Sequence, residues 1–257
     1  MRIQTSFART EMKFLLSEQQ LKTMEDLMKE KCQWDAYPIS TISSIYYDTP
    51  DCRLVRRSIE KPMYKEKLRL RVYGTPNENS AAFVEIKKKY DSVVYKRRTA
   101  LNITDAMAWL AGNTSHRDSQ IEREITQFLS FYGDLRPTAM IAYDRDSFLS
   151  KDDCDLRVTF DKNPRARITD LTLLAGDHGR LLLPDGQAIM EVKSHTGLPL
   201  WLTKALSENR IYKTGFSKYG AAYSTMIMPR TFGRRLTDGN AAAAYDKNFT
   251  NGGRIYA

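Results

Sequence analysis

Charged and apolar residues alternate in the stretch "KEKLRLRVYG", which covers residues 65 to 74. Cations occupy every second position and apolar residues lie between them: Lys65, Lys67, Arg69 and Arg71 against Leu68, Leu70 and Val72. Successive side chains of a β-strand point to opposite faces, so this pattern predicts a strand with one cationic face and one apolar face. A solvated sheet surface is the simplest interpretation of one such strand.

Seven further stretches have a similar strand-like pattern: "ARTEMKFL", "ISSIYYDT", "AFVEIKKKY", "VVYKRRTAL", "TAMIAYDRDSF", "CDLRVTFDK" and "AIMEVKSH". In most of them the residues at alternate positions are charged. The connections between many of these stretches are short, and short connections favour antiparallel pairing. The sequence therefore predicts about eight strands, most of them antiparallel.

Helical periodicity is found in fewer places. Ser17 and Gln20 form a capping box, after which Leu21, Met24 and Met28 recur at helical spacing. The stretch "DAMAWLA" predicts a short helix opened by Thr104, and a further helix follows Asp118 or Ser119. Two more helices are predicted from "PLWLTKALSENRI" and "SKYGAAYSTMI". Strands and helices together indicate an α+β fold.

Composition limits the classes of partner. The chain has 257 residues, with 40 Lys and Arg against 31 Asp and Glu, and this excess of positive charge favours an anionic partner. The three cysteines are isolated, which argues against a disulfide framework or a zinc site and fits a reducing, cytoplasmic setting. No signal peptide or membrane-spanning segment is predicted. We expect one domain at residues 1–228 and an irregular or disordered tail at 229–257.

The charged positions are more informative when the strands are considered together. Like charges on neighbouring strands destabilise a sheet unless an anion compensates them. If eight strands close into a barrel, one parity faces the lumen and the other packs under helices. The lumen would then hold these cations: Lys13, Arg69, Arg71, Lys87, Arg145 and Arg157. A polyphosphate would neutralise them.

Acidic residues share the parity of these cations. They are Glu11, Glu85, Asp161 and Glu191. Mg²⁺ and Mn²⁺ bind carboxylate and phosphate oxygens together, so a basic tunnel with a few carboxylates suits a metal-bound triphosphate. Salt bridges to neighbouring lysines are an equally good interpretation of Glu11 and Glu85.

The order of the motifs "RTEMKF", "SIYYDT", "LRLRVYG", "FVEIKKK", "AYDR", "LRVTFD", "MEVKS" and "GFSKY" resembles a known family. This family is the vacuolar transporter chaperone (VTC) domain, or polyphosphate polymerase domain, of the triphosphate tunnel metalloenzyme superfamily. The resemblance implies an eight-stranded antiparallel barrel with flanking helices. It also implies transfer of the γ-phosphate of ATP onto a growing inorganic polyphosphate chain, assisted by Mn²⁺ or Mg²⁺.

The resemblance also implies residue roles. Phosphates would be clamped by the lumen cations given above, with Arg69, Arg71, Lys87, Arg145 and Arg157 as the catalytic set. Substrate contacts are implied for Lys13, Tyr143, Lys193, Ser217 and Lys218. Metal binding is implied for Glu191 first, and then for Glu11 and Glu85.

Several alternatives remain open from the sequence. The chain has Arg9 where hydrolases of the superfamily carry a glutamate, in the stretch that continues with Glu11 and Lys13, and this difference favours the polymerase branch. A triphosphatase and a non-catalytic binder of polyphosphate or inositol phosphates are the other candidates. No nucleic-acid partner is expected, whereas a membrane-associated partner is compatible with the resemblance. Lys65 and Lys67 are expected at the mouth of the tunnel, and Tyr46 and Tyr47 are expected to be packing residues.

Overall fold

The computed structural model describes residues 10–91, 93–113, 119–152, 156–195 and 197–231. Nine strands form one sheet: β1 (Thr10–Leu16), β2 (Cys32–Asp48), β3 (Tyr64–Tyr73), β4 (Ala81–Tyr90), β5 (Val93–Asn102), β6 (Arg136–Ser150), β7 (Arg157–Arg167), β8 (Arg180–Leu181) and β9 (Ala188–Ser194). Their order is β1-β9-β7-β6-β2-β3-β4-β5, with β8 added to β7. All neighbouring strands are antiparallel, as the sequence predicts.

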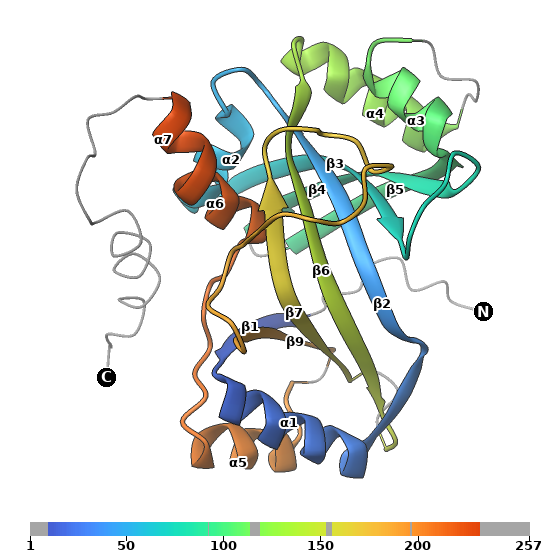
Figure 1. Ribbon diagram of the computed structural model, residues 1–257. Coiled ribbons are helices and arrows are strands. Elements are labelled where there is room, and N and C mark those ends of the chain that lie inside the picture. Colours follow the sequence, from blue (N-terminus) through green and yellow to red (C-terminus); the bar gives the residue numbers. More distant parts are fainter. Residues whose placement is uncertain (1–9, 92, 114–118, 153–155, 196, 232–257) are drawn as a thin grey trace.

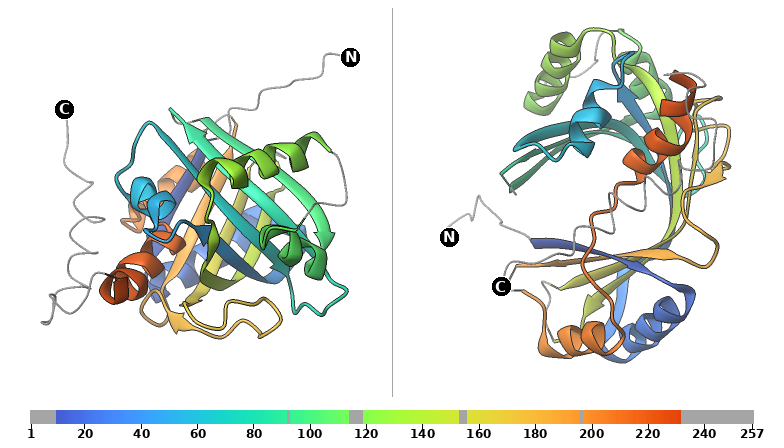
Figure 2. Two further views of the ribbon diagram at one scale, coloured as in Figure 1. Left: turned by 90° about the horizontal axis from the view of Figure 1, so that it is seen from above. Right: turned by 90° about the vertical axis from the view of Figure 1, so that its left-hand side faces the viewer.

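The sheet curls but does not close within the described residues. The strands at its two ends are β1 and β5, and the sheet order does not pair them with each other. The two ends of the curl approach each other through side chains, since Lys87 Nζ of β4 lies 3.6 Å from Glu11 Oε2 of β1. Figure 2 shows the resulting curved sheet, which has a concave inner face. The predicted α+β antiparallel fold is confirmed, in the form of a curled sheet.

Helices flank the sheet at both ends (Figure 1). They are α1 (Glu18–Lys31), α2 (Arg53–Ile59), α3 (Ile103–Leu110), α4 (Gln120–Tyr132), α5 (Leu200–Glu208), α6 (Lys218–Ala222), the π-helix η1 (Tyr223–Ile227) and α7 (Met228–Thr231). Ser17 and Gln20 form both bonds of the predicted capping box of α1. Ser119 caps α4 as predicted, whereas α3 begins one residue before Thr104 and is capped by Asn102. Helix α2 was not predicted from the sequence.

The outer face of the sheet carries the apolar parity of the strands. In one half, Phe14, Phe160 and Val192 pack with residues of α1 and α5. In the other half, Leu68, Leu70 and other apolar residues pack under α3 and α4. Burial of apolar surface on this side stabilises the fold and leaves the charged parity on the inner face.

A smaller apolar cluster lies on the inner face and anchors α2, α6 and η1. It includes Tyr46 and Tyr143 from the sheet, and Tyr219 and Ile227 from the C-terminal helices. This cluster places the beginning of α6 beside the charged residues of the inner face. The expected boundary at residues 228/229 falls within α7, and residues 232–257 of the expected tail lie outside the described residues. No described helix is long and apolar enough to cross a membrane.

Candidate functional site

Strand register brings the charged parity together on the inner face. Lys13 lies opposite Glu191, Arg145 opposite Asp161, and Arg69 opposite Glu85 in their respective strand pairs. Directly opposed residues of an antiparallel pair point to the same face, so these pairs belong to one surface. The structure therefore gathers twelve of the thirteen predicted site residues around the inner face near one another, and only Arg157 stands apart, as described below.

Glu191 of β9 is the centre of one group of contacts. Its carboxylate lies 2.9 Å from Lys13 Nζ, 3.6 Å from Arg145 Nη2 and 3.9 Å from Lys218 Nζ. Burial alone would raise the pKa of Glu191, but these three cations outweigh burial and hold that pKa well below its usual range. The Glu191 carboxylate is therefore ionised, as a metal ligand has to be.

Asp161 of β7 lies beside Glu191 and was not assigned a role in the predicted site. Arg145 donates two hydrogen bonds to its carboxylate at 2.6 and 2.8 Å, and Lys218 Nζ donates a third. Despite complete burial, which opposes ionisation, Lys218 and Arg145 lower the pKa of Asp161. The forked geometry orients the guanidinium of Arg145 along the inner face.

Glu11 of β1 connects the two ends of the curled sheet. Its carboxylate lies 3.5 Å from Lys13 Nζ and 3.6 Å from Lys87 Nζ. Burial opposes ionisation of Glu11, but Lys87 and Lys13 lower its pKa overall. Lys13 thus lies between Glu11 and Glu191, and its own pKa is raised in spite of burial because both carboxylates favour its charged form.

Glu85 of β4 lies in a more cationic environment. Its carboxylate is 2.7 Å from Arg69 Nε, 2.6 Å from Lys96 Nζ and 3.8 Å from Arg71 Nε. Burial would raise the pKa of Glu85, but these cations lower it to about 2. The salt-bridge interpretation of Glu85 and Glu11 is thus observed in the structure, while metal binding by either residue stays a prediction.

Arg71 and Tyr143 connect β3 with β6 across the inner face. Arg71 donates hydrogen bonds to Ser44 Oγ at 3.1 Å and to the Tyr143 hydroxyl at 3.3 Å. Lys218 Nζ lies 4.2 Å from the centre of the Tyr143 ring, and the Arg145 guanidinium lies 5.2 Å from it. Tyr143 therefore holds cations from three elements around one ring, partly through cation–π attraction.

Lys67 and Tyr46 also contact this site, although neither was among the predicted site residues. Lys67 was expected at the mouth, yet its Nζ donates to Ser217 Oγ at 3.1 Å, and Ser217 caps α6. Tyr46 packs as expected, stacked on Tyr219, and its hydroxyl also accepts a hydrogen bond from Arg69 Nη1 at 3.2 Å. Lys67 has the same strand parity as Arg69, and this parity could have indicated that it faces inward. For the adjacent residues Tyr46 and Tyr47, the sequence does not indicate which of the two faces inward.

The two remaining predicted residues differ in their surroundings. Lys193 of β9 lies opposite Glu11 of β1 and Arg157 of β7. It has no ion-pair partner among the described residues. Arg157 shares the inner face, but its Nη2 pairs with Asp35 Oδ2 at 2.6 Å and its side chain is 44% exposed. The structure therefore separates Arg157 from the cluster around Glu191.

The inner face also determines where a metal ion would fit. No group of three His, Cys, Asp or Glu residues in the described part of the chain could hold a metal without other ligands. Glu11 and Glu191 nevertheless provide two ionised carboxylates on either side of Lys13. Divalent Mg²⁺ is commonly held by one or two carboxylates together with phosphate oxygens, so these residues fit a metal that arrives with a phosphate ligand.

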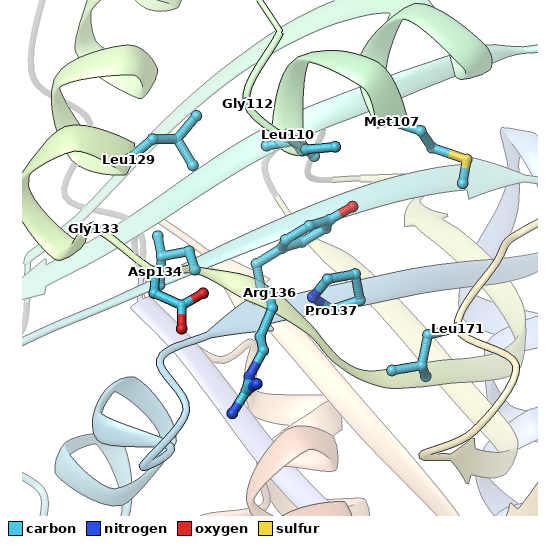
Figure 3. Close-up of a pocket in the computed structure, with 12 residues that line it drawn as sticks. Met107, Leu110, Gly112, Leu129, Gly133, Asp134, Arg136, Pro137 and Leu171 are labelled. Carbon is cyan, nitrogen blue, oxygen red and sulfur yellow. The ribbon is translucent and has the colours of Figure 1, made fainter.

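A separate pocket lies on the other side of the sheet. Its volume is about 490 Å³, and its lining includes Met107 of α3, Leu129 of α4 and Pro137 of β6 (Figure 3). Tyr47 also lines it, from the face of β2 opposite to Tyr46. The pocket is lined mainly by apolar residues.

Comparison with known proteins identifies a family for most of the chain. The family model of the VTC domain matches residues 8–227. A search of curated proteins gave no match. Among solved structures, a candidate adenylyl cyclase from Hippeastrum with a dominant triphosphatase activity is 13% identical, with a TM-score of 0.47 and coverage of 88% of this chain and 97% of that one.

Two other solved structures are similar at the same low level of identity. A candidate adenylate cyclase from Bacillus halodurans is 14% identical, with a TM-score of 0.45 and coverage of 92% of this chain and 98% of that one. The capping enzyme triphosphatase of Mimivirus is 8% identical, with a TM-score of 0.35 and coverage of 79% and 88%.

Proposed function

The chain belongs to the VTC domain family, and we propose that it is an ATP-dependent polyphosphate polymerase. In this reaction the bond between the β- and γ-phosphates of ATP breaks, the γ-phosphate joins the end of an inorganic polyphosphate chain, and ADP leaves. ATP and polyphosphate are therefore the proposed partners, and the cytoplasmic setting expected from the cysteines is part of the proposal.

The length of the cationic row on β3 and β4 carries this proposal. Lys65, Lys67, Arg69 and Arg71 share one face over seven residues of strand, which corresponds to roughly 20 Å. Lys87 and Lys89 of β4 lie directly opposite Lys67 and Lys65 and so widen the row. This row is longer than the triphosphate of one nucleotide requires, and it suits a phosphate chain that continues beyond the reacting group.

The contacts on the inner face supply what phosphoryl transfer needs. Such transfers depend mainly on in-line positioning and on neutralisation of charge spread over the transferred group. Arg69, Arg71 and Arg145 have their guanidinium groups oriented by Glu85, Tyr143 and Asp161, so their forks are fixed before substrate arrives. Lys13, Lys87 and Lys218 add point charges around the same space. Lys193, Ser217 and Arg157 are proposed as further contacts along the chain.

Mn²⁺ or Mg²⁺ is the proposed cofactor. Glu191 would hold it, with Glu11 as the second carboxylate, and Glu85 remains a third candidate that would first have to exchange its cation partners. When bound, the metal would neutralise phosphate charge and help to orient the phosphates. The acceptor is itself an ionised phosphate, so the proposed reaction does not require a strong general base.

The product of ATP turnover tests the proposal. Purified protein with ATP and Mn²⁺ is expected to release ADP and to form an anionic polymer that an added phosphatase degrades. Arg69→Gln should abolish the polymer, while Arg97→Gln serves as a matched control because Arg97 pairs with Glu124 of α4 at 3.0 Å on the other face of the sheet.

Other products would assign a different activity. Release of orthophosphate without polymer would show a triphosphatase. Tight binding of polyphosphate or inositol phosphates without any turnover would show a non-catalytic binder. Either result would overturn the polymerase assignment.

A further inference from the structure

The hydroxyl of Tyr46 lies on the inner face of the curled sheet and is free to donate a hydrogen bond there. Its oxygen accepts a hydrogen bond from Arg69 Nη1 at 3.2 Å, and its ring lies under the same guanidinium at 6.0 Å. No described residue accepts the proton of this hydroxyl. A phenol that accepts from a cation but has no protein acceptor can donate only to solvent or to a ligand.

The Tyr46 ring is held rigidly in this orientation. It stacks on Tyr219 of α6, with 4.6 Å between the ring centroids and 20° between the planes. The Tyr219 hydroxyl donates to Asp48 Oδ2 at 2.8 Å, and the same carboxylate accepts backbone N–H groups of Leu54 and Val55 at the start of α2. Tyr46 therefore cannot easily turn its hydroxyl away from the inner face.

Charged and titratable groups approach Tyr46 from every element around it. They are Lys67, Arg69 and Arg71 of β3, Glu85 of β4 behind Arg69, Tyr143 of β6, Asp48 of β2, Cys52 directly before α2 and Tyr219 of α6. The cations of β3 have the largest electrostatic effect on the Tyr46 hydroxyl. The Glu85 carboxylate forms ion pairs with Arg69 and Lys96 instead. The described residues thus place more positive than negative charge near the phenol.

This excess of positive charge affects both Tyr46 and Lys67. Burial by itself raises the pKa of Tyr46, but Arg69, Arg71 and Lys67 outweigh burial and lower that pKa to about 7. Burial lowers the pKa of Lys67 to about 8, with further contributions from Lys87 and Lys13, although Tyr46 opposes this shift. In both groups an arriving anion would favour the protonated form.

We propose that Tyr46 is a proton-linked phosphate ligand. In the empty site its phenolate is the counter-ion of Arg69, Arg71 and Lys67. When a phosphate chain enters, the phenolate takes one proton from solvent, and the resulting O–H donates a hydrogen bond to a phosphate oxygen. The proposal rests on the proposed function, because it requires a phosphate chain to bind on this face.

The exchange of counter-ions explains how so cationic a face can exist without substrate. A phenolate next to Arg69 reduces the repulsion among the cations of β3, and the phosphate takes over this role when it binds. Between pH 7 and about 10, binding then has to return a proton to Tyr46. The apparent affinity for phosphate chains should therefore fall with increasing pH by up to about tenfold per unit, apart from the titration of the ligand and Lys67.

Tyrosinate absorbance in the near ultraviolet tests the proposal directly. In metal-free buffer the wild-type protein should show a transition of about one tyrosine centred near pH 7. Tyr46→Phe should remove it. Tyr47→Phe is the matched control and should retain it, because Tyr47 lies on the other face of β2 and burial raises its pKa to about 12.

Addition of inorganic tripolyphosphate at pH 8 then tests the link to binding. Saturation, followed independently by titration calorimetry, should remove the tyrosinate signal of wild type and Tyr47→Phe. Binding without loss of the signal would overturn the proton link but leave the proposed function intact, and so would a near-neutral transition that is undiminished in Tyr46→Phe. Absence of any tripolyphosphate binding would overturn both. If Tyr46→Phe fails to fold, the wild-type titration with and without tripolyphosphate still decides the question.

Discussion

The two halves of the inner face balance their charges in different ways. On β3, β4 and β5 the inner face has one carboxylate, Glu85, among many cations: Lys65, Lys67, Arg69, Arg71, Lys87, Lys89, Lys96 and Arg98. We call this half the basic wall. On β1, β9, β7 and β6, together with the start of α6, cations alternate with acids: Lys13, Lys193, Arg145 and Lys218 with Glu11, Glu191 and Asp161. We call this half the mixed wall.

This difference indicates a division of roles. In the mixed wall each cation except Lys193 is fixed by a carboxylate, so its geometry is set before any ligand arrives. In the basic wall most of the positive charge has no protein counterpart, and only an anionic ligand or the Tyr46 phenolate can offset it. We therefore expect substitutions in the mixed wall to affect turnover most, and substitutions in the basic wall to affect binding and the stability of the empty protein.

The largest effect is expected for Glu191→Gln in the mixed wall. The substitution removes the proposed metal ligand and leaves Lys13 with only Glu11 as a partner, so turnover should fall by roughly a hundredfold or more. Binding of tripolyphosphate without metal should be unchanged or tighter, since one negative charge is lost. ADP release and calorimetry measure the two quantities.

Glu66→Gln is the control for this substitution. Glu66 is also a buried carboxylate, but it lies on the other face of β3 and is held by Tyr64 and Tyr132. Normal turnover in Glu191→Gln, or an equal loss in Glu66→Gln, would remove the distinction between the two walls.

Arg69→Ala should reduce binding and turnover much more than Arg157→Ala, because Arg69 lies within the charged cluster and Arg157 at its periphery. Arg69 contacts Glu85 and Tyr46 within the basic wall, and its loss should weaken tripolyphosphate binding and turnover by roughly a hundredfold. Arg157 is paired with Asp35 and is 44% exposed, so its loss should cost less than about tenfold. Steady-state kinetics on both variants measures the difference. An equal or larger effect of Arg157→Ala would place Arg157 within the reacting cluster rather than at its periphery.

The sequence predicted most of the fold and the face on which most candidate site residues lie, for a physical reason. Burial on the outer face forces strict alternation, so the parity of each charged residue could be read without coordinates. The capping box at Ser17 likewise depends only on local residues. The strand order and register confirm that these stretches are strands of one antiparallel sheet.

Other features depend on long-range register and could not be predicted. Tyr46 and Tyr47 are neighbours in an apolar stretch, and only the pairing of Tyr46 with Arg69 shows which one faces inward. Arg157 has the correct parity, but its height along β7 places it beside Asp35, after a register shift in β2 between Trp34 and Ile39. Parity identifies a face, whereas distances along that face come from the assembled sheet.

Acid should destabilise the protein through the one carboxylate of the basic wall. The pKa of Glu85 is about 2 in the folded protein, against 4.5 for an ordinary glutamate, so the unfolded chain binds more protons between these values. The contribution of Glu85 to the free energy of unfolding should therefore be fully present above pH 4.5. It should decrease by up to about 3 kcal/mol as the pH falls toward 2. Urea unfolding at a series of pH values measures it. Glu85→Gln should have a flatter profile, and an unchanged profile would show that Glu85 is not the responsible group.

The smallest effect is expected for a cation of the basic wall, Lys67, whose charge is opposite to that of Glu85. The pKa of Lys67 is about 8 in the folded protein and 10.5 in an ordinary lysine, so the unfolded chain again binds more protons between these values. Stability of the empty protein should thus increase with pH from 8 to 10.5, and it should be lower at neutral pH than without this charge. Lys67→Met should therefore stabilise the ligand-free protein at pH 7, by on the order of 1 kcal/mol, while it weakens tripolyphosphate binding.

Lys204→Met, at an exposed position of α5, is the control and should change neither stability nor tripolyphosphate binding. If Lys67→Met instead destabilised the empty protein, Lys67 would be held by its bond to Ser217 rather than repelled by its neighbours, and the basic wall would be as well balanced as the mixed wall.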